Sequence, residues 1–116
     1  MELKVHQPAG GAAAANVATV SGEVDLHSAP GLRDQLGDLL AGANPSLILD
    51  LNEVGFLDST GLGALVAARA SATEHGGQLA LVCTQPRILK LFTITGLNSV
   101  FKIHSSVDDA LANIAA

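Results

Sequence analysis

Ser59 and Thr60 are two adjacent hydroxyl residues that directly follow Asp58, where an apolar segment gives way to helical spacing. Residues 47–51 read LILDL, which is typical of a buried strand, whereas residues 62–69 carry apolar side chains at helical intervals. The sequence therefore predicts that Ser59 lies at the N-terminus of a helix. The first N–H groups of a helix lack partners within it and carry partial positive charge, so this position suits a capping oxygen or a phosphate.

The same segment could serve two other kinds of chemistry. A hydrolase would use Ser59 as a nucleophile, but this requires a positioned base, and the local sequence is not the Gly-x-Ser-x-Gly elbow. A nucleotide enzyme would use the glycines of residues 61–63, but the third glycine of the dinucleotide fingerprint and the Gly-Lys-Ser/Thr of a P-loop are missing. We therefore expect no enzyme activity and no cofactor. The candidate bases are scattered along the chain: His6, His27, His75 and His104.

These residues also have structural interpretations. Residues 58–60 are of the types that commonly cap helices, and Gly61 and Gly63 could simply allow a helix to pack closely. Cys83 is expected in the core, because a free cysteine behaves as a small hydrophobic residue. Neither Cys83 nor the histidines show the spacing of metal ligands, so we expect no metal site.

Glu23 and Asp25 flank a valine at the end of an expected strand, close to the rim of the sheet. Carboxylates in such a place are often only solvated. Because exposed loops also carry binding residues, contact with a partner is the second interpretation of this pair.

Composition limits the possible functions. The chain has 116 residues, of which 48% are hydrophobic and 15% charged, so it is long enough for one core, and we expect one domain over residues 1–116. The net charge is -5, with no cluster of Lys or Arg, which argues against binding to nucleic acid. The absence of Trp and Tyr also argues against a surface for stacking bases.

A cytoplasmic location is expected from two features. Cys83 is the single cysteine, which excludes an internal disulfide and suits a reducing compartment. No apolar run approaches the length needed to span a membrane, and the first residues lack the pattern of a signal peptide.

Strands and helices are expected to alternate along most of the chain, which is typical of an α/β fold with a largely parallel sheet. Residues 7–16 are rich in small residues and are expected to join the first two strands as a loose hairpin. Ser106 is expected to cap the last helix. The expected strands are residues 3–5, 17–26, 47–51, 78–83 and 100–103, and the expected helices are residues 29–41, 59–74, 86–95 and 107–114.

Three blocks of sequence closely resemble the bacterial anti-sigma factor antagonists, which are the single-domain members of the STAS family. They are residues 22–25 (GEVD), 56–63 (FLDSTGLG) and 94–97 (ITGL), of which the second is the most specific. The similarity runs in order over nearly the whole chain; the extra residues 10–15 depart from it by lengthening the first hairpin. The resemblance implies a small mixed sheet of about five strands, with about four helices packed mainly on one side.

The resemblance also implies a function in partner switching. Such a protein, when unphosphorylated, binds an anti-sigma factor that is also a serine kinase, and so frees a sigma factor for transcription. The kinase then phosphorylates the hydroxyl directly after the motif aspartate, here Ser59 and less favourably Thr60, and a PP2C-type phosphatase removes the phosphate. By the same resemblance, the partner-binding residues are Glu23, Asp25, Asp58, Ser59, Thr60, Gly61 and Leu62.

A STAS module of another type is the main rival. In that case the same fold would be an unphosphorylated docking module of a transporter for lipids or anions.

Overall fold

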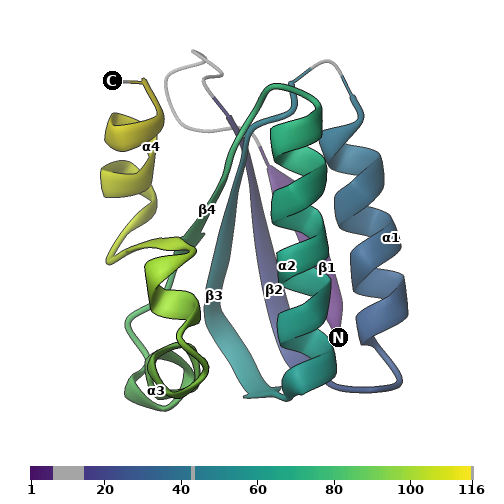
Figure 1. The fold of residues 1–116 in the computed structure, drawn as a ribbon, viewed down its shortest axis with the longest axis vertical. Coiled ribbons are helices and arrows are strands. Elements are labelled where there is room, and N and C mark those ends of the chain that lie inside the picture. Colours follow the sequence, from purple (N-terminus) through teal and green to yellow (C-terminus); the bar gives the residue numbers. More distant parts are fainter. Residues whose placement is uncertain (7–14, 43, 116) are drawn as a thin grey trace.

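The computed structural model describes residues 1–6, 15–42 and 44–115. The expected hairpin loop and the insert at residues 10–15 lie almost entirely outside the described residues. The elements follow in the order β1 (Glu2–His6), β2 (Asn16–Val24), α1 (Ala29–Leu40), β3 (Leu47–Leu57), α2 (Ser59–Glu74), β4 (Leu79–Val82), α3 (Pro86–Thr95), the short 3₁₀ helix η1 (Leu97–Ser99), β5 (Lys102–His104) and α4 (Val107–Ala115) (Figure 1).

The five strands form one mixed sheet in the order β1-β2-β3-β4-β5. The first pair, β1 and β2, is antiparallel, and all later neighbours are parallel. Parallel neighbours need a crossover connection, and α1, α2 and α3 provide one each. The mixed sheet of about five strands with four helices is therefore confirmed.

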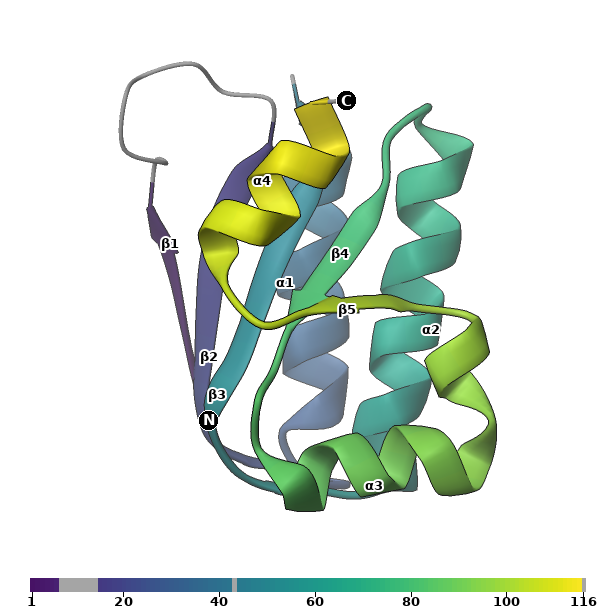
Figure 2. The same ribbon diagram turned by 90° about the vertical axis from the view of Figure 1, so that its left-hand side faces the viewer.

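Two layers of helices cover the sheet unequally. The helices α1 and α2 lie side by side on one face, whereas α4 lies on the other face, in front of β3 in Figure 2, and packs against β3, β4 and β5. The larger core lies under α1 and α2 and includes buried Leu32, Leu36 and Leu65. The smaller core lies under α4 and includes Ile48, Val82 and Ala110.

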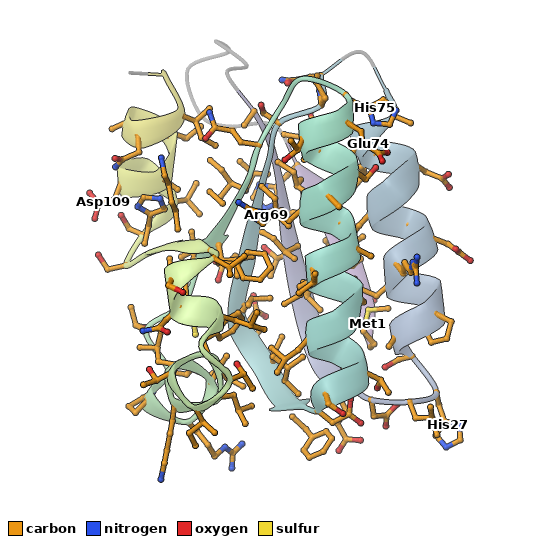
Figure 3. The ribbon with its side chains drawn as sticks, viewed as in Figure 1. Met1, His27, Arg69, Glu74, His75 and Asp109 are labelled. Atoms are coloured by element: carbon orange, nitrogen blue, oxygen red, sulfur yellow. The ribbon has the colours of Figure 1, made fainter. Side chains whose placement is uncertain are left out.

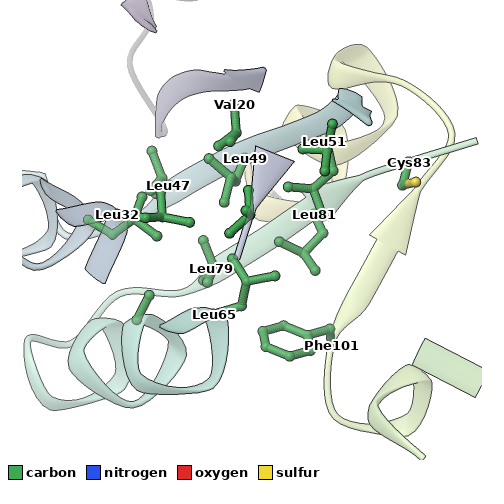
Figure 4. Packing of buried hydrophobic residues seen from close by; sticks show 14 of the residues in the cluster. Val20, Leu32, Leu47, Leu49, Leu51, Leu65, Leu79, Leu81, Cys83 and Phe101 are labelled. Atoms are coloured by element: carbon green, nitrogen blue, oxygen red, sulfur yellow. The ribbon is translucent and has the colours of Figure 1, made fainter. Parts of the chain in front are cut away.

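Side chains along β3 alternate between these two cores. Leu47, Leu49 and Leu51 join the larger cluster, which Figure 4 shows at close range, and Ile48 joins the smaller one. Because successive side chains of a strand point to opposite faces, a strand covered on both sides is mostly apolar, as residues 47–51 are, with the half-buried Asp50 as the exception. Cys83 is also buried in the larger core, as predicted. Burial raises the pKa of its thiol.

The strand β3 is longer than predicted, because it continues from Leu51 to Leu57. Its second half pairs with residues 21–24 of β2 through two shifts in register. Val54 and Leu57 are still buried, but Gly55 and Phe56 between them are exposed, so the sequence shows no regular alternation that would predict a strand there. The extension carries the chain to the end of the sheet at which Ser59 lies.

The other boundaries differ by one or two residues. The strand β2 ends at Val24 rather than at residue 26, and β5 begins at Lys102, after the turn that follows η1. The predicted cap of α4 is confirmed, because the backbone N–H of Asp109 donates to Ser106 Oγ at 3.1 Å.

Candidate functional site

Two loops come together at the carboxyl ends of β2 and β3. Val24 pairs with Leu57 in the sheet, so Asp25 and Asp58, which follow them directly, start neighbouring loops. The backbone N–H of Asp58 donates to the carbonyl oxygen of Val24 at 3.2 Å, which ties the second loop to the first. In an open α/β sheet, this end of the strands is where binding sites usually form.

Asp58 caps the helix α2. Its Oδ1 accepts hydrogen bonds from the backbone N–H groups of Thr60 at 3.0 Å and Gly61 at 3.1 Å, and a third from the Thr60 hydroxyl. The Thr60 hydroxyl and then the Gly61 N–H lower the pKa of Asp58 below its ordinary value. The carboxylate is therefore ionised at neutral pH, and its negative charge lies beside Ser59.

Ser59 and Thr60 differ in what their hydroxyls do. Both residues are exposed at the start of α2, as the sequence predicted. The Thr60 hydroxyl donates to Asp58, whereas Ser59 Oγ forms no hydrogen bond with any residue of the described part of the chain. Of the two oxygens, that of Ser59 is the one available to a reagent or to another protein.

Gly61 allows α2 to begin close to the sheet. A Cβ atom at this position would lie 2.5 Å from Leu57 Cδ1 and 2.8 Å from Val24 Cγ1, both far inside contact distance. The predicted close packing is therefore confirmed for Gly61. It is wrong for Gly63, where a Cβ would meet nothing within 4 Å.

Leu62 lies below the surface of the site. Its side chain is only 6% exposed and belongs to the larger core, and Gly61 is also buried. The two residues thus shape the site from beneath, and they offer a partner little side-chain area in this conformation.

Asp25 organises the loop between β2 and α1. Its Oδ1 accepts from the backbone N–H groups of His27 at 2.9 Å and Ser28 at 3.1 Å. The Ser28 N–H is the main cause that lowers the pKa of Asp25. The Ser28 hydroxyl accepts from the Asp25 N–H and donates to the Glu23 carbonyl, so the loop is closed on itself. Sequence reasoning placed Asp25 at the rim correctly but missed this structural role.

Comparison with known proteins now identifies the family. The model of the STAS domain family matches residues 10–110. The anti-sigma-B factor antagonist of Bacillus subtilis is 39% identical over 84 residues, which cover 72% of this chain and 76% of that protein. This chain belongs to the STAS domain family.

Solved structures agree with this assignment. A crystal structure of an anti-sigma factor antagonist from Mycobacterium paratuberculosis matches with a TM-score of 0.83 and 30% identity, over 99% of this chain and 96% of that one. A sulfate transporter family protein from Wolinella succinogenes has the same fold, with a TM-score of 0.72 and 22% identity, over 85% of this chain and 83% of that one. The fold alone therefore does not separate antagonists from other STAS proteins.

The histidines of this STAS domain do not surround Ser59. His75 lies at the far end of the 16-residue helix α2, and His27 lies in the loop before α1 (Figure 3). Within the described ranges, no histidine forms a hydrogen bond with Ser59, and no group of His, Cys, Asp or Glu side chains is arranged to hold a metal ion. The described helices also include none with the length and apolar character needed to cross a membrane.

A hollow beside the site was not foreseen from the sequence. It has a volume of about 540 Å³ and lies between α3 and the end of β3, with Phe56, Leu91 and Ile94 in its walls and Arg87 and Lys90 beside them. We call it the α3 hollow. The usable signal was a row of apolar residues at three-residue intervals on α3, because Ile88, Leu91 and Ile94 follow one another along the helix from the buried core to the surface.

Proposed function

We propose that this STAS domain is an anti-sigma factor antagonist that works by partner switching. Its unphosphorylated form binds an anti-sigma factor that is also a serine kinase, and a sigma factor is thereby released. Phosphorylation of Ser59 ends the binding, and a PP2C-type phosphatase restores it. The proposal draws on the anti-sigma-B factor antagonist of Bacillus subtilis and on the geometry around Ser59.

The free hydroxyl of Ser59 is the observation that carries the proposal. A kinase needs an exposed oxygen whose hydrogen bonds can be given up cheaply, and Ser59 Oγ has none to break within the described residues. Thr60 is the poorer acceptor, because its hydroxyl is already bonded to Asp58. We therefore assign the modification to Ser59.

Electrostatics explains how one phosphate could stop binding. A phosphoserine adds about -1.5 to -2 charges at neutral pH. This charge would lie next to the ionised Asp58, on a chain whose net charge is already -5. Burying an unpaired charge in an interface costs roughly 2–5 kcal/mol, which corresponds to a loss of affinity of about thirtyfold or more.

The helix would survive this modification. Asp58 already holds the N–H groups of Thr60 and Gly61, so the added phosphate does not need to replace a cap. Switching then requires only a change of surface charge and no change of fold. This separates the signal at Ser59 from the stability of the domain.

The partner-binding surface consists of the two neighbouring loops. Glu23, Asp25 and Asp58 supply negative charge, and Ser59 and Thr60 supply hydroxyls at the start of α2. Gly61 and Leu62 hold this helix start in place from below. We expect the protein to meet its kinase in the cytoplasm, to contact no nucleic acid directly, and to catalyse no reaction itself.

Incubation with a kinase tests the proposal. The wild type is mixed with ATP and each serine-kinase anti-sigma factor of the same genome, and the modified residue is mapped by mass spectrometry. We expect phosphate on Ser59 in the wild type, none in Ser59→Ala, and phosphate still on Ser59 in Thr60→Val, which separates the two hydroxyls as acceptors. We also expect Ser59→Ala to bind the kinase as wild type does, and Ser59→Asp to bind at least tenfold more weakly.

Two results would contradict the proposal. Phosphorylation that persists in Ser59→Ala would place the acceptor elsewhere. Equal binding of Ser59→Ala and Ser59→Asp, with no phosphorylation by any kinase tested, would instead favour the unphosphorylated docking module.

A further inference from the structure

Two large apolar side chains in the walls of the α3 hollow are exposed to solvent. Ile94 is 69% exposed and Phe56 is 49% exposed, and both lie in its walls. On α3, Ile88 and Phe92 are buried in the core, and Ile88, Leu91 and Ile94 lie in the wall of the hollow. Clustered exposed apolar residues mark contact sites for other molecules more often than they serve the fold.

The charges at the hollow are opposite to those of the protein as a whole. The chain has six basic residues, and two of them, Arg87 and Lys90, line this hollow, with Glu23 as the acidic residue among its described lining. Arg87 Nη2 donates to the carbonyl oxygen of Gly55 at 2.6 Å, which holds the guanidinium at the edge. Neither cation forms an ion pair with a residue of the described ranges.

We propose that the α3 hollow is a second part of the partner-binding surface, and that it takes an apolar side chain on an acidic segment of the anti-sigma factor. This inference rests on the proposed function. The apolar walls match the side chain, and Arg87 and Lys90 match the acidic segment. The hollow also adjoins the Ser59 loops, because Glu23 lines it and pairs with Phe56 in the sheet.

Two other occupants fit the hollow less well. A small molecule is usually enclosed over 70–90% of its surface, whereas two of the apolar side chains in the walls here, Phe56 and Ile94, stay 49% and 69% exposed. A second copy of this chain, docked about a two-fold axis at the hollow, would bring Arg87 and Lys90 of each copy together. Such like-charge contacts are unfavourable, so an acidic partner is the better match.

The Ser59 loops and the α3 hollow contribute differently to binding because their residues differ. The Ser59 loops carry the group that phosphorylation changes, whereas the α3 hollow contains no hydroxyl acceptor among its described lining residues. Buried apolar anchors usually supply most of the affinity of an interface, and charges at its rim mainly set the association rate. The hollow therefore supplies affinity and orientation that do not depend on the switch.

Binding kinetics test this inference. Wild type, Ile94→Asp and Lys90→Glu are measured against the serine-kinase anti-sigma factor that phosphorylates Ser59, without ATP and at two salt concentrations. We expect Ile94→Asp to weaken binding at least tenfold, mainly through faster dissociation. Lys90→Glu should slow association severalfold at low salt and less at high salt. The controls are Val5→Asp, an exposed apolar site on β1, and Lys102→Glu, an exposed cation on β5, and both should stay within twofold of wild type.

The outcomes separate this inference from the proposed function. If Ser59→Asp fails to bind but Ile94→Asp and Lys90→Glu bind as wild type does, the function stands and the hollow is not part of the interface. If no kinase binds the wild type, both the proposed function and the inference on the α3 hollow are wrong. Sedimentation of the free proteins completes the test: a wild-type dimer that Ile94→Asp dissociates would assign the hollow to self-association and overturn the inference.

Discussion

The loops after β2 and β3 are both held by an aspartate that binds backbone N–H groups, but they differ in whether their serine hydroxyl forms hydrogen bonds. In each loop an aspartate directly follows the strand and accepts hydrogen bonds from two backbone N–H groups further on: Asp25 from His27 and Ser28, and Asp58 from Thr60 and Gly61. In the first loop the Ser28 hydroxyl accepts a hydrogen bond from the Asp25 N–H and donates to the Glu23 carbonyl. In the second loop Ser59 Oγ has no partner within the described residues.

This difference explains how one surface can be both rigid and modifiable. In the first loop the Ser28 hydroxyl and the Asp25 carboxylate both form hydrogen bonds that close the loop on itself. The side-chain hydrogen bonds of the second loop are made by Asp58 and Thr60 and do not involve the Ser59 hydroxyl, so its serine can change without loss of structure. A residue that is phosphorylated and dephosphorylated repeatedly on a folded protein must not be one that holds the fold together.

The two loops also differ in their glycines, and here we expect the largest effect on stability. Gly31 and Gly61 both occupy the third position of their helix, counted from the caps at Ser28 and Asp58. A Cβ at Gly61 would collide with Leu57 and Val24, so Gly61→Ala should lower the free energy of unfolding by about 1–3 kcal/mol. Urea unfolding followed by circular dichroism measures this.

Gly31→Ala is the matched control. A Cβ at Gly31 meets nothing within 4 Å, so the substitution should be neutral or should raise the free energy of unfolding by up to about 1 kcal/mol. If both variants unfolded at the same urea concentration, the close approach of α2 to β2 and β3 would not be what fixes the second loop.

Much of this architecture could be predicted from the sequence, because local pattern determines it. Apolar residues at helical spacing, with proline or glycine at the ends, predicted the helices, and the block at residues 56–63 pointed to Ser59. The second half of β3 could not be predicted, because its residues are half exposed and are held by pairing with β2. The closed loop at Ser28 could not be predicted from the sequence either, because it depends on how the Ser28 side chain is oriented.

The serines of the two loops provide the next test. Ser28→Ala removes a hydroxyl that accepts from Asp25 and donates to Glu23, so it should destabilise the fold by about 0.5–1.5 kcal/mol. Ser59→Ala removes a hydroxyl without a described partner and should change stability by less than about 0.5 kcal/mol. Urea unfolding of both variants side by side decides the matter. An equal loss in both would mean that Ser59 also supports the fold.

The smallest expected effect concerns the charge of the two aspartates. The hydrogen bond from the Thr60 hydroxyl is the main cause that lowers the pKa of Asp58, whereas for Asp25 the main cause is the backbone N–H of Ser28. Thr60→Val should therefore raise the pKa of Asp58 towards its ordinary range and leave that of Asp25 unchanged. Carbon-13 NMR titration of the carboxyl groups measures both.

The sign of the accompanying change in stability follows from proton linkage. A carboxyl group whose pKa is lowered by folding stabilises the protein above its ordinary pKa, and this contribution is lost as the pH falls through the folded value. Thr60→Val should thus be less stable than wild type at neutral pH, and the difference should narrow in acid. An unchanged titration of Asp58 would show that the threonine hydroxyl does not hold the carboxylate, and Thr60 would then compete with Ser59 as the free hydroxyl of the second loop.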